Sequence, residues 1–145
     1  GLKDSSGNMV YFHKLQSLLK DHPDFALLIG REELLAEAIL LGGHGCVCGG
    51  ANFIPKLYVD LYNAASSRDL PAIEALHEKV MQISSAIYSV GRYESSSLKG
   101  LKCTLSCMKI CSDFLAEPFH RFRSTERDTI RRHLEELGIV KNNLR

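Results

Sequence analysis

Two kinds of hydrophobic pattern follow one another in the first half of the chain. After the polar segment 4–8, apolar residues recur at helical spacing. Residues 25–29 are instead five consecutive apolar residues closed by Gly30, as in a strand buried on both faces. The patterns predict helices over residues 10–20 and 32–41 and buried strands over residues 25–29 and 46–48.

The second half carries helical patterns alone. Asn52 can cap a helix up to Ala65 with Pro55 in its first turn, where a missing N–H is harmless. Further helices are predicted over residues 70–90, 98–111 and 124–138.

Strands that alternate with helices are typical of right-handed βαβ units around a parallel sheet. Two strands and the fragment of a third at the N-terminus do not bury the faces and edges of such a sheet. Either several protomers complete the sheet, or the chain is the C-terminal part of something larger. We favour the second interpretation.

Composition disfavours some classes of function. The 145 residues include 18 Lys and Arg against 17 Asp and Glu, a net charge of +1, which argues against binding nucleic acid or a membrane surface through overall charge. No apolar run approaches the roughly 20 residues of a membrane-spanning helix. Five cysteines without the spacing of a disulfide framework fit a reducing compartment. We therefore expect a soluble, cytoplasmic globular protein.

The cysteines do not predict a metal site. Cys46 and Cys48 are two apart on a predicted strand, but no second pair stands at the spacing of a zinc ribbon. Cys103, Cys107 and Cys111 recur every four residues of one predicted helix, as in a packing face of small residues. We expect neither a metal nor another cofactor.

Lys3 is the strongest candidate for chemistry. It stands at the carboxyl end of a predicted strand and before a polar turn, where barrel enzymes carry catalytic groups. A lysine desolvated by apolar neighbours loses its proton more readily and can attack a carbonyl to form a Schiff base. The alternative is a surface lysine at the edge of a loop.

Other polar residues leave two interpretations open. Glu32 and Glu33 follow Gly30 at the next strand end. They either accept hydrogen bonds from substrate hydroxyls or are first-turn residues favoured by the helix dipole.

The basic and aromatic stretch 119–123 is short and isolated, so we interpret it as a solvated connection or a subunit contact rather than a nucleic-acid site.

Four parts of the chain, in order, resemble the dihydrodipicolinate synthase / N-acetylneuraminate lyase family of class I aldolases. Residues 1–8 resemble its Schiff-base lysine segment, residues 28–33 its next strand end, residues 42–52 its last barrel strand, and residues 98–102 and 117–119 its C-terminal helical region.

The resemblance implies an α/β fold, the C-terminal part of a (β/α)8 TIM barrel. It would hold the last three strands, the first of them truncated, followed by a C-terminal helical region. Residues 1–66 would be the last βα units, starting at the Schiff-base lysine, and residues 67–145 a three-helix extension. The missing N-terminal barrel strands would come from outside this chain, and the protein would be a homo-oligomer, usually a tetramer in this family.

The resemblance also assigns roles to single residues. Lys3 would form the Schiff base with a 2-oxo acid such as pyruvate, and Val47 would approach the pyruvate moiety through its backbone. The residues that would line the substrate chain are Ser5, Gly30, Glu32, Glu33 and Gly49. An iminium is an electron sink, so the C3–C4 bond of the 2-oxo acid can break or form through an enamine.

Two departures from the family pattern limit the prediction. The family's proton-relay tyrosine and its threonine-containing carboxylate loop come from strands before Lys3, so we expect the 145-residue chain alone to be inactive. Residues 98–102 are similar to the sialic-acid lyase and 4-hydroxy-2-oxoglutarate aldolase branches. Gly49 and Glu32 replace the serine and aspartate of the lyase branch, which disfavours sialic acid itself.

The main prediction is a lyase that cleaves or forms a C–C bond of a hydroxylated 2-oxo acid. Alternatives are a dihydrodipicolinate synthase, which condenses pyruvate with aspartate semialdehyde, and a 2-oxo sugar acid dehydratase. A non-catalytic half-barrel that serves oligomerisation or ligand sensing is an alternative of another class. A helical adaptor built on residues 52–138 is a further one.

Overall fold

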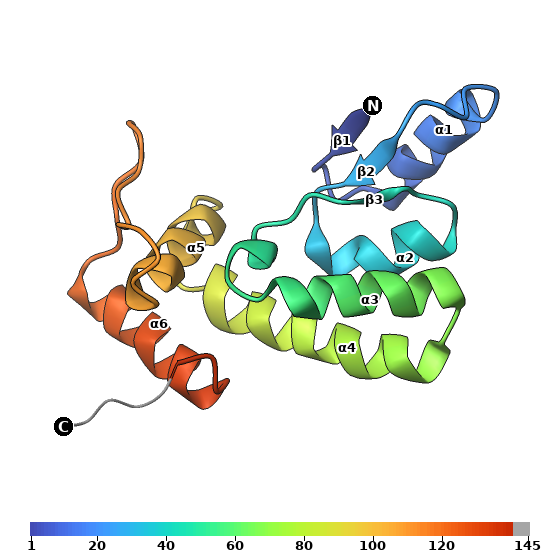
Figure 1. Cartoon of the computed structure of the whole chain (residues 1–145). Helices are drawn as coiled ribbons and strands as arrows, with labels where there is room; N and C mark the ends of the chain where they lie inside the picture. Colours follow the sequence, from blue (N-terminus) through green and yellow to red (C-terminus); the bar gives the residue numbers. More distant parts are fainter. Residues whose placement is uncertain (141–145) are drawn as a thin grey trace. The chain divides into compact units, whose positions relative to one another are not determined.

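The computed structural model describes residues 1–140 and divides the chain after Val80 into two compact units (Figure 1). The first unit holds a small sheet and the helices around it, and the second is helical. No helix within the described residues is long and apolar enough to cross a membrane.

The sheet of the first unit is parallel, as the sequence predicted. Its strands are β1 (Leu2–Asp4), β2 (Leu27–Ile29) and β3 (Gly45–Cys46), with β2 in the middle. Lys3 pairs with Leu28, and Leu28 pairs with Gly45. The middle strand is shorter than the predicted run 25–29 because the Phe25 amide donates to the His22 carbonyl in a turn instead of joining the ladder.

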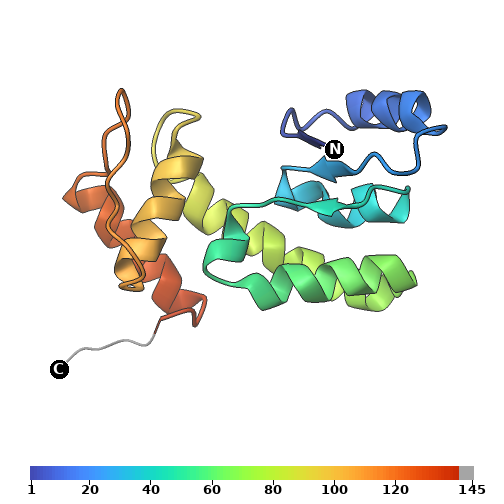
Figure 2. The same ribbon diagram turned by 45° about the horizontal axis from the view of Figure 1, so that its top comes forward.

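Helices cover one face of this sheet. The hydrophobic core of the first unit lies between the sheet and these helices. The helices are α1 (Met9–Leu19) and α2 (Leu35–Leu40), the latter preceded by the 3-10 turn η1 (Glu32–Leu34). Figure 2 shows both helices beside the strands. The core cluster consists of Phe12, Leu27, Ile29 and Ala38, each 2% exposed or less. In β2, Leu27 and Ile29 are buried and Leu28 is partly buried, which is why a continuous apolar run predicted this strand.

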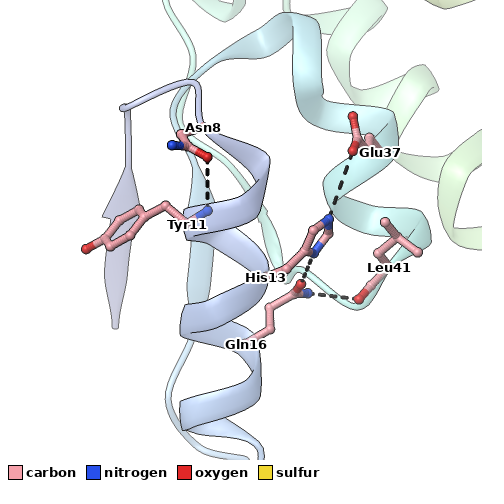
Figure 3. Close-up of polar contacts among 6 residues, drawn as sticks. All are labelled: Asn8, Tyr11, His13, Gln16, Glu37 and Leu41. Atoms are coloured by element: carbon pink, nitrogen blue, oxygen red, sulfur yellow. Dashed lines mark hydrogen bonds and ion pairs between the residues drawn. The ribbon is translucent and has the colours of Figure 1, made fainter.

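Polar contacts fix α1 and tie it to α2 (Figure 3). The Asn8 side chain caps α1 by accepting from the Tyr11 amide at 3.1 Å. Gln16 Nε2 donates to the Leu41 carbonyl at 2.8 Å, so its amide oxygen is left to accept from His13 Nδ1 at 2.8 Å. His13 Nε2 then lies 4.0 Å from the Glu37 carboxylate on α2.

A third helix, α3 (Pro55–Ser67), packs against α2 with Leu57, Leu61 and Ala65 buried. Pro55 occupies the first turn, as predicted. The predicted Asn52 cap is wrong, because the N-cap residue is Ile54. The Asn52 side chain instead donates to the Gly49 carbonyl at 2.9 Å within the 3-10 turn η2 (Gly50–Asn52).

The second unit differs from the sequence prediction in two places. The helix expected over residues 70–90 is α4 (Leu70–Ile83), which begins in the first unit and continues as the π turn η3 (Ser84–Tyr88). The helix expected over residues 98–111 is α5 (Ser96–Cys107), which ends early because Lys109 has a left-handed backbone with φ of 60°. Cys111 is therefore exposed and outside the cysteine face of that helix.

A close backbone approach and a buried carboxylate connect elements of the second unit. A side chain at Gly100 of α5 would place its Cβ 2.2 Å from the Ile87 carbonyl oxygen, so only glycine lets the π turn approach. Asp113, between α5 and α6 (Ser124–Glu136), is 5% exposed and forms ion pairs with Arg127 and Arg121.

Cys103 and Cys107 lie one turn apart on α5 and share a hydrogen bond between their thiols. The Cys103 thiol donates this bond to Cys107, which lowers the pKa of Cys107 to about 6, and the charges of Arg131 and Arg127 act in the same direction. The same hydrogen bond, together with burial, raises the pKa of Cys103.

This pair gives a prediction for thiol reactivity. Cys107 is partly exposed, so the rate of its alkylation by iodoacetamide is expected to level off above about pH 7 because the thiolate is already formed there. Peptide mass spectrometry of the alkylated protein at a series of pH values measures this rate. A rate that keeps rising with pH and reaches half of its maximum at about pH 8.5, as for an ordinary cysteine, contradicts the assignment.

Candidate active site

The carboxyl ends of the three strands lie side by side at one edge of the sheet. Because the strands are parallel and paired in register, the segments at and just after their carboxyl ends meet there. These segments are residues 3–5, 30–33 and 47–50, and they contain all seven site residues predicted from the sequence. In barrels and open α/β sheets this is the edge at which ligands bind.

Lys3 lies on the sheet face opposite the helices. Side chains alternate along a strand, and Lys3, Leu28 and Gly45 are partners across the ladder, so they share one face. The neighbouring positions Leu27 and Ile29 belong to the core under α1 and α2. Lys3 therefore projects away from the packed layer.

The expected desolvation of Lys3 by apolar neighbours is not found, because Lys3 is exposed in this chain. Within the described residues, β1 pairs with β2 on one side only. The face that carries Lys3 is also not the one covered by α1 and α2.

Ser5 and Gly30 meet directly beside Lys3. A Cβ at Gly30 would lie 2.1 Å from Ser5 Oγ, so Gly30 leaves the room that this hydroxyl occupies. The Gly30 amide donates to the Asp4 carbonyl at 2.7 Å, and the Asp4 carboxylate accepts from the Ser6 amide at 2.8 Å. These bonds fix the turn after β1 against the end of β2.

Glu32 points inward and is held by the protein itself. Its side chain is 4% exposed. Its Oε1 accepts from the Tyr58 hydroxyl at 2.7 Å, and its Oε2 accepts from the Gly50 amide at 2.9 Å. Glu33, the next residue, is only partly buried, so the two glutamates predicted as equivalent occupy different environments.

Tyr58 was not predicted as a residue of this site. It lies on α3, 26 positions after Glu32, and is 4% exposed. The available signal was a tyrosine on the apolar face of a predicted helix, since a buried phenol needs a hydrogen-bond partner.

The segment after β3 presents backbone groups rather than polar side chains at the carboxyl-end edge of the sheet. Val47 donates its amide to the Ile29 carbonyl at 2.9 Å, and its side chain is 52% exposed. The Gly49 carbonyl accepts from the Asn52 side chain and amide. Val47 and Gly49 thus stand at the same edge as Lys3.

Cys46 and Cys48 flank Val47 and share a thiol hydrogen bond. As the donor, Cys46 has its pKa raised by this bond and by burial, whereas the bond lowers the pKa of Cys48. Among residues 1–140, no group of three or more His, Cys, Asp or Glu side chains is arranged to hold a metal ion.

A family model described as the Dihydrodipicolinate synthetase family matches residues 1–137. The chain belongs to this family. A 4-hydroxy-tetrahydrodipicolinate synthase of Methanopyrus kandleri is 27% identical, over 97% of this chain and 44% of its own length. A probable 2-dehydro-3-deoxy-D-pentonate aldolase of Escherichia coli is 29% identical, over 74% of this chain and 35% of its own length.

Solved structures agree with the fold. The dihydrodipicolinate synthase of Bacteroides thetaiotaomicron is 55% identical, with a TM-score of 0.88 over 92% of this chain and 45% of its own. An N-acetylneuraminate lyase of Fusobacterium nucleatum, 14% identical, shares the fold with a TM-score of 0.76 over 94% of this chain and 44% of its own.

The chain thus spans under half the length of these dihydrodipicolinate synthetase family relatives. The predicted fold class is confirmed: three parallel strands with their helices form part of the TIM barrel, followed by a helical region.

Proposed function

We propose that this chain supplies the Schiff-base lysine and one wall of the substrate site of a class I lyase or aldolase. The observation that carries the proposal is the position of Lys3, at the carboxyl end of β1 beside the Ser5–Gly30 contact, in a member of this family. The substrate is a 2-oxo acid of the pyruvate type.

The reaction begins when the neutral amine of Lys3 attacks the C2 carbonyl and water leaves, which gives an iminium. When C3–C4 breaks, its electron pair moves into the iminium to form an enamine, the C4 hydroxyl loses its proton, and an aldehyde is released. Protonation at C3 and hydrolysis of the imine then return pyruvate and the free lysine. The condensation runs through the same enamine in reverse.

The residues around Lys3 have separate roles in this proposal. Ser5 and Glu33 face the substrate chain with polar groups, and Gly30 and Gly49 leave space for it. The Val47 backbone lies against the pyruvate moiety. The group that accepts the hydroxyl proton and the loop that binds the carboxylate belong to the barrel strands outside this chain, so those strands are its required partner. We propose a homo-oligomeric, cytoplasmic enzyme without a metal or other cofactor.

Cleavage of a hydroxylated 2-oxo acid is the main candidate reaction. Condensation of pyruvate with aspartate semialdehyde is the second candidate, supported by the 55% identity to the Bacteroides dihydrodipicolinate synthase.

Borohydride trapping tests the proposal. The complete barrel that carries this chain is incubated with pyruvate and sodium borohydride, and peptide mass spectrometry locates the reduced adduct. We expect the adduct on Lys3 with pyruvate and none with lactate, which has no carbonyl at C2, and we expect the 145-residue chain alone to stay unlabelled.

A panel of 2-oxo acids then separates the two reactions by which aldehyde is released or consumed. Absence of an adduct on Lys3 with every 2-oxo acid would overturn the proposed function. Full labelling of the isolated chain would overturn its dependence on the remaining strands.

A further inference from the structure

Glu32, Gly50 and Tyr58 form a buried connection between the ends of β2 and β3 and helix α3, which we name the carboxylate brace. We propose that the brace is a positioning device: Glu32 holds the β3 end at the active-site edge and does not bind the substrate chain. The inference rests on the proposed function and changes the role that the family resemblance assigned to Glu32.

The hydrogen bonds of Glu32 support this assignment. Both carboxylate oxygens accept from protein donors: Oε1 accepts from Tyr58 Oη at 2.7 Å, and Oε2 accepts from the Gly50 amide at 2.9 Å. With 4% exposure, the side chain of Glu32 does not open onto the solvent-facing edge. Bonds to an ionised carboxylate are stronger than those between neutral groups, so the brace restrains the backbone it holds.

Gly50 makes the brace possible. A Cβ at this position would lie 2.0 Å from Tyr58 Oη and 2.4 Å from the carbon that bears it. Any other residue would displace the phenol from Glu32. The third member of the brace must therefore be a glycine. It donates its amide to Glu32, and because it has no side chain it leaves room for the Tyr58 ring.

The brace acts on the residues that the proposed mechanism places against pyruvate. Gly50 follows Gly49 directly, and the Val47 amide donates a hydrogen bond to the Ile29 carbonyl of β2. The position of this short segment is thus set at one end by the ladder and at the other by Glu32. Lys3 lies on β1 and makes none of these bonds.

This separation predicts a specific kinetic result. Tyr58→Phe and Glu32→Gln, measured in the complete barrel, are expected to lower kcat for the carbon–carbon step about tenfold or more, because small misplacements of reacting groups are costly. The extent of Lys3 trapping at saturating pyruvate stays at the unmodified level, since β1 is not touched. Tyr62→Phe is the matched control: Tyr62 is an exposed tyrosine one turn further along α3, and its variant is expected to keep kcat.

Amide hydrogen exchange provides a readout independent of activity. In Glu32→Gln the Gly50 amide faces a neutral and reoriented side chain, so its exchange is expected to rise at least several-fold, with no change in Tyr62→Phe. Glu32→Asp is too short to reach both donors at once and is expected to behave like Glu32→Gln.

The possible results are distinct. Unchanged Gly50 exchange in Glu32→Gln, or unchanged kcat in Tyr58→Phe, overturns the positioning role. A Glu32→Gln variant that keeps the Gly50 amide protected but raises the KM of the aldehyde substrate alone shows that Glu32 binds substrate, and this also overturns the inference. If Lys3 of the unmodified protein is never trapped, the proposed function fails and the catalytic role of the brace fails with it, even where the exchange result shows that the hydrogen bonds exist.

Discussion

Lys3→Arg is expected to remove borohydride-dependent labelling by pyruvate and to lower kcat of the complete barrel by roughly 10³-fold or more, as for the loss of a covalent nucleophile in other enzymes. The variant keeps a positive charge at the end of β1, but a guanidinium stays protonated and has no lone pair with which to attack a carbonyl. The expected loss therefore reports nucleophilic chemistry rather than electrostatics.

Steady-state kinetics and mass spectrometry of the trapped peptide measure this effect. Lys14→Arg is the matched control, because Lys14 is an exposed lysine on α1, and we expect it to keep both activity and labelling. Residual pyruvate labelling at another lysine in Lys3→Arg would contradict the assignment of Lys3.

Phe12→Ala is expected to have the largest effect on stability among the core residues of the first unit. Phe12 is fully buried between α1 and the sheet, against Leu27, Ile29 and Ala38. Removal of a buried aromatic ring costs about 3–5 kcal/mol in the free energy of unfolding. Because this core supports the strand ends that carry the site, activity at elevated temperature should fall with it.

Urea denaturation followed by far-ultraviolet circular dichroism checks the value. Phe12→Leu keeps most of the apolar volume and is expected to cost much less, about 1 kcal/mol. Equal losses in the two variants would show that the ring does not fill the core as described.

The sheet and its edge could be predicted because their signals are local. The apolar run 25–29, closed by a glycine, predicts the strand β2 (Leu27–Ile29), and parallel strands bring their carboxyl ends together whatever their exact length. The grouping of Lys3, Gly30 and Val47 follows from that alone.

The ends of helices were less predictable because tertiary contacts decide them. The π turn after Ile83 packs its Ile87 carbonyl against Gly100, 13 positions further along the chain, and no periodicity in residues 84–88 indicates this. The left-handed backbone of Lys109, a residue type that rarely adopts it, ends α5 without a glycine signal.

The environment of Glu32 could not be predicted from its neighbours. Adjacent glutamates after a strand look alike in sequence, and only the approach of Tyr58 from α3 distinguishes them. The glutamate of the pair that points inward is thus set by a helix that begins 23 positions after Glu32, at Pro55.

The carboxylate brace also limits how this segment can be recombined with its relatives. A graft that exchanges only the β3 loop keeps the brace only where its donor also has glycine at position 50, and a graft of α3 alone keeps it only where its donor also has tyrosine at position 58. Residues 32–58 should therefore be transplanted as one cassette, and chimaeras with crossovers inside that interval are the ones expected to lose turnover while they remain folded.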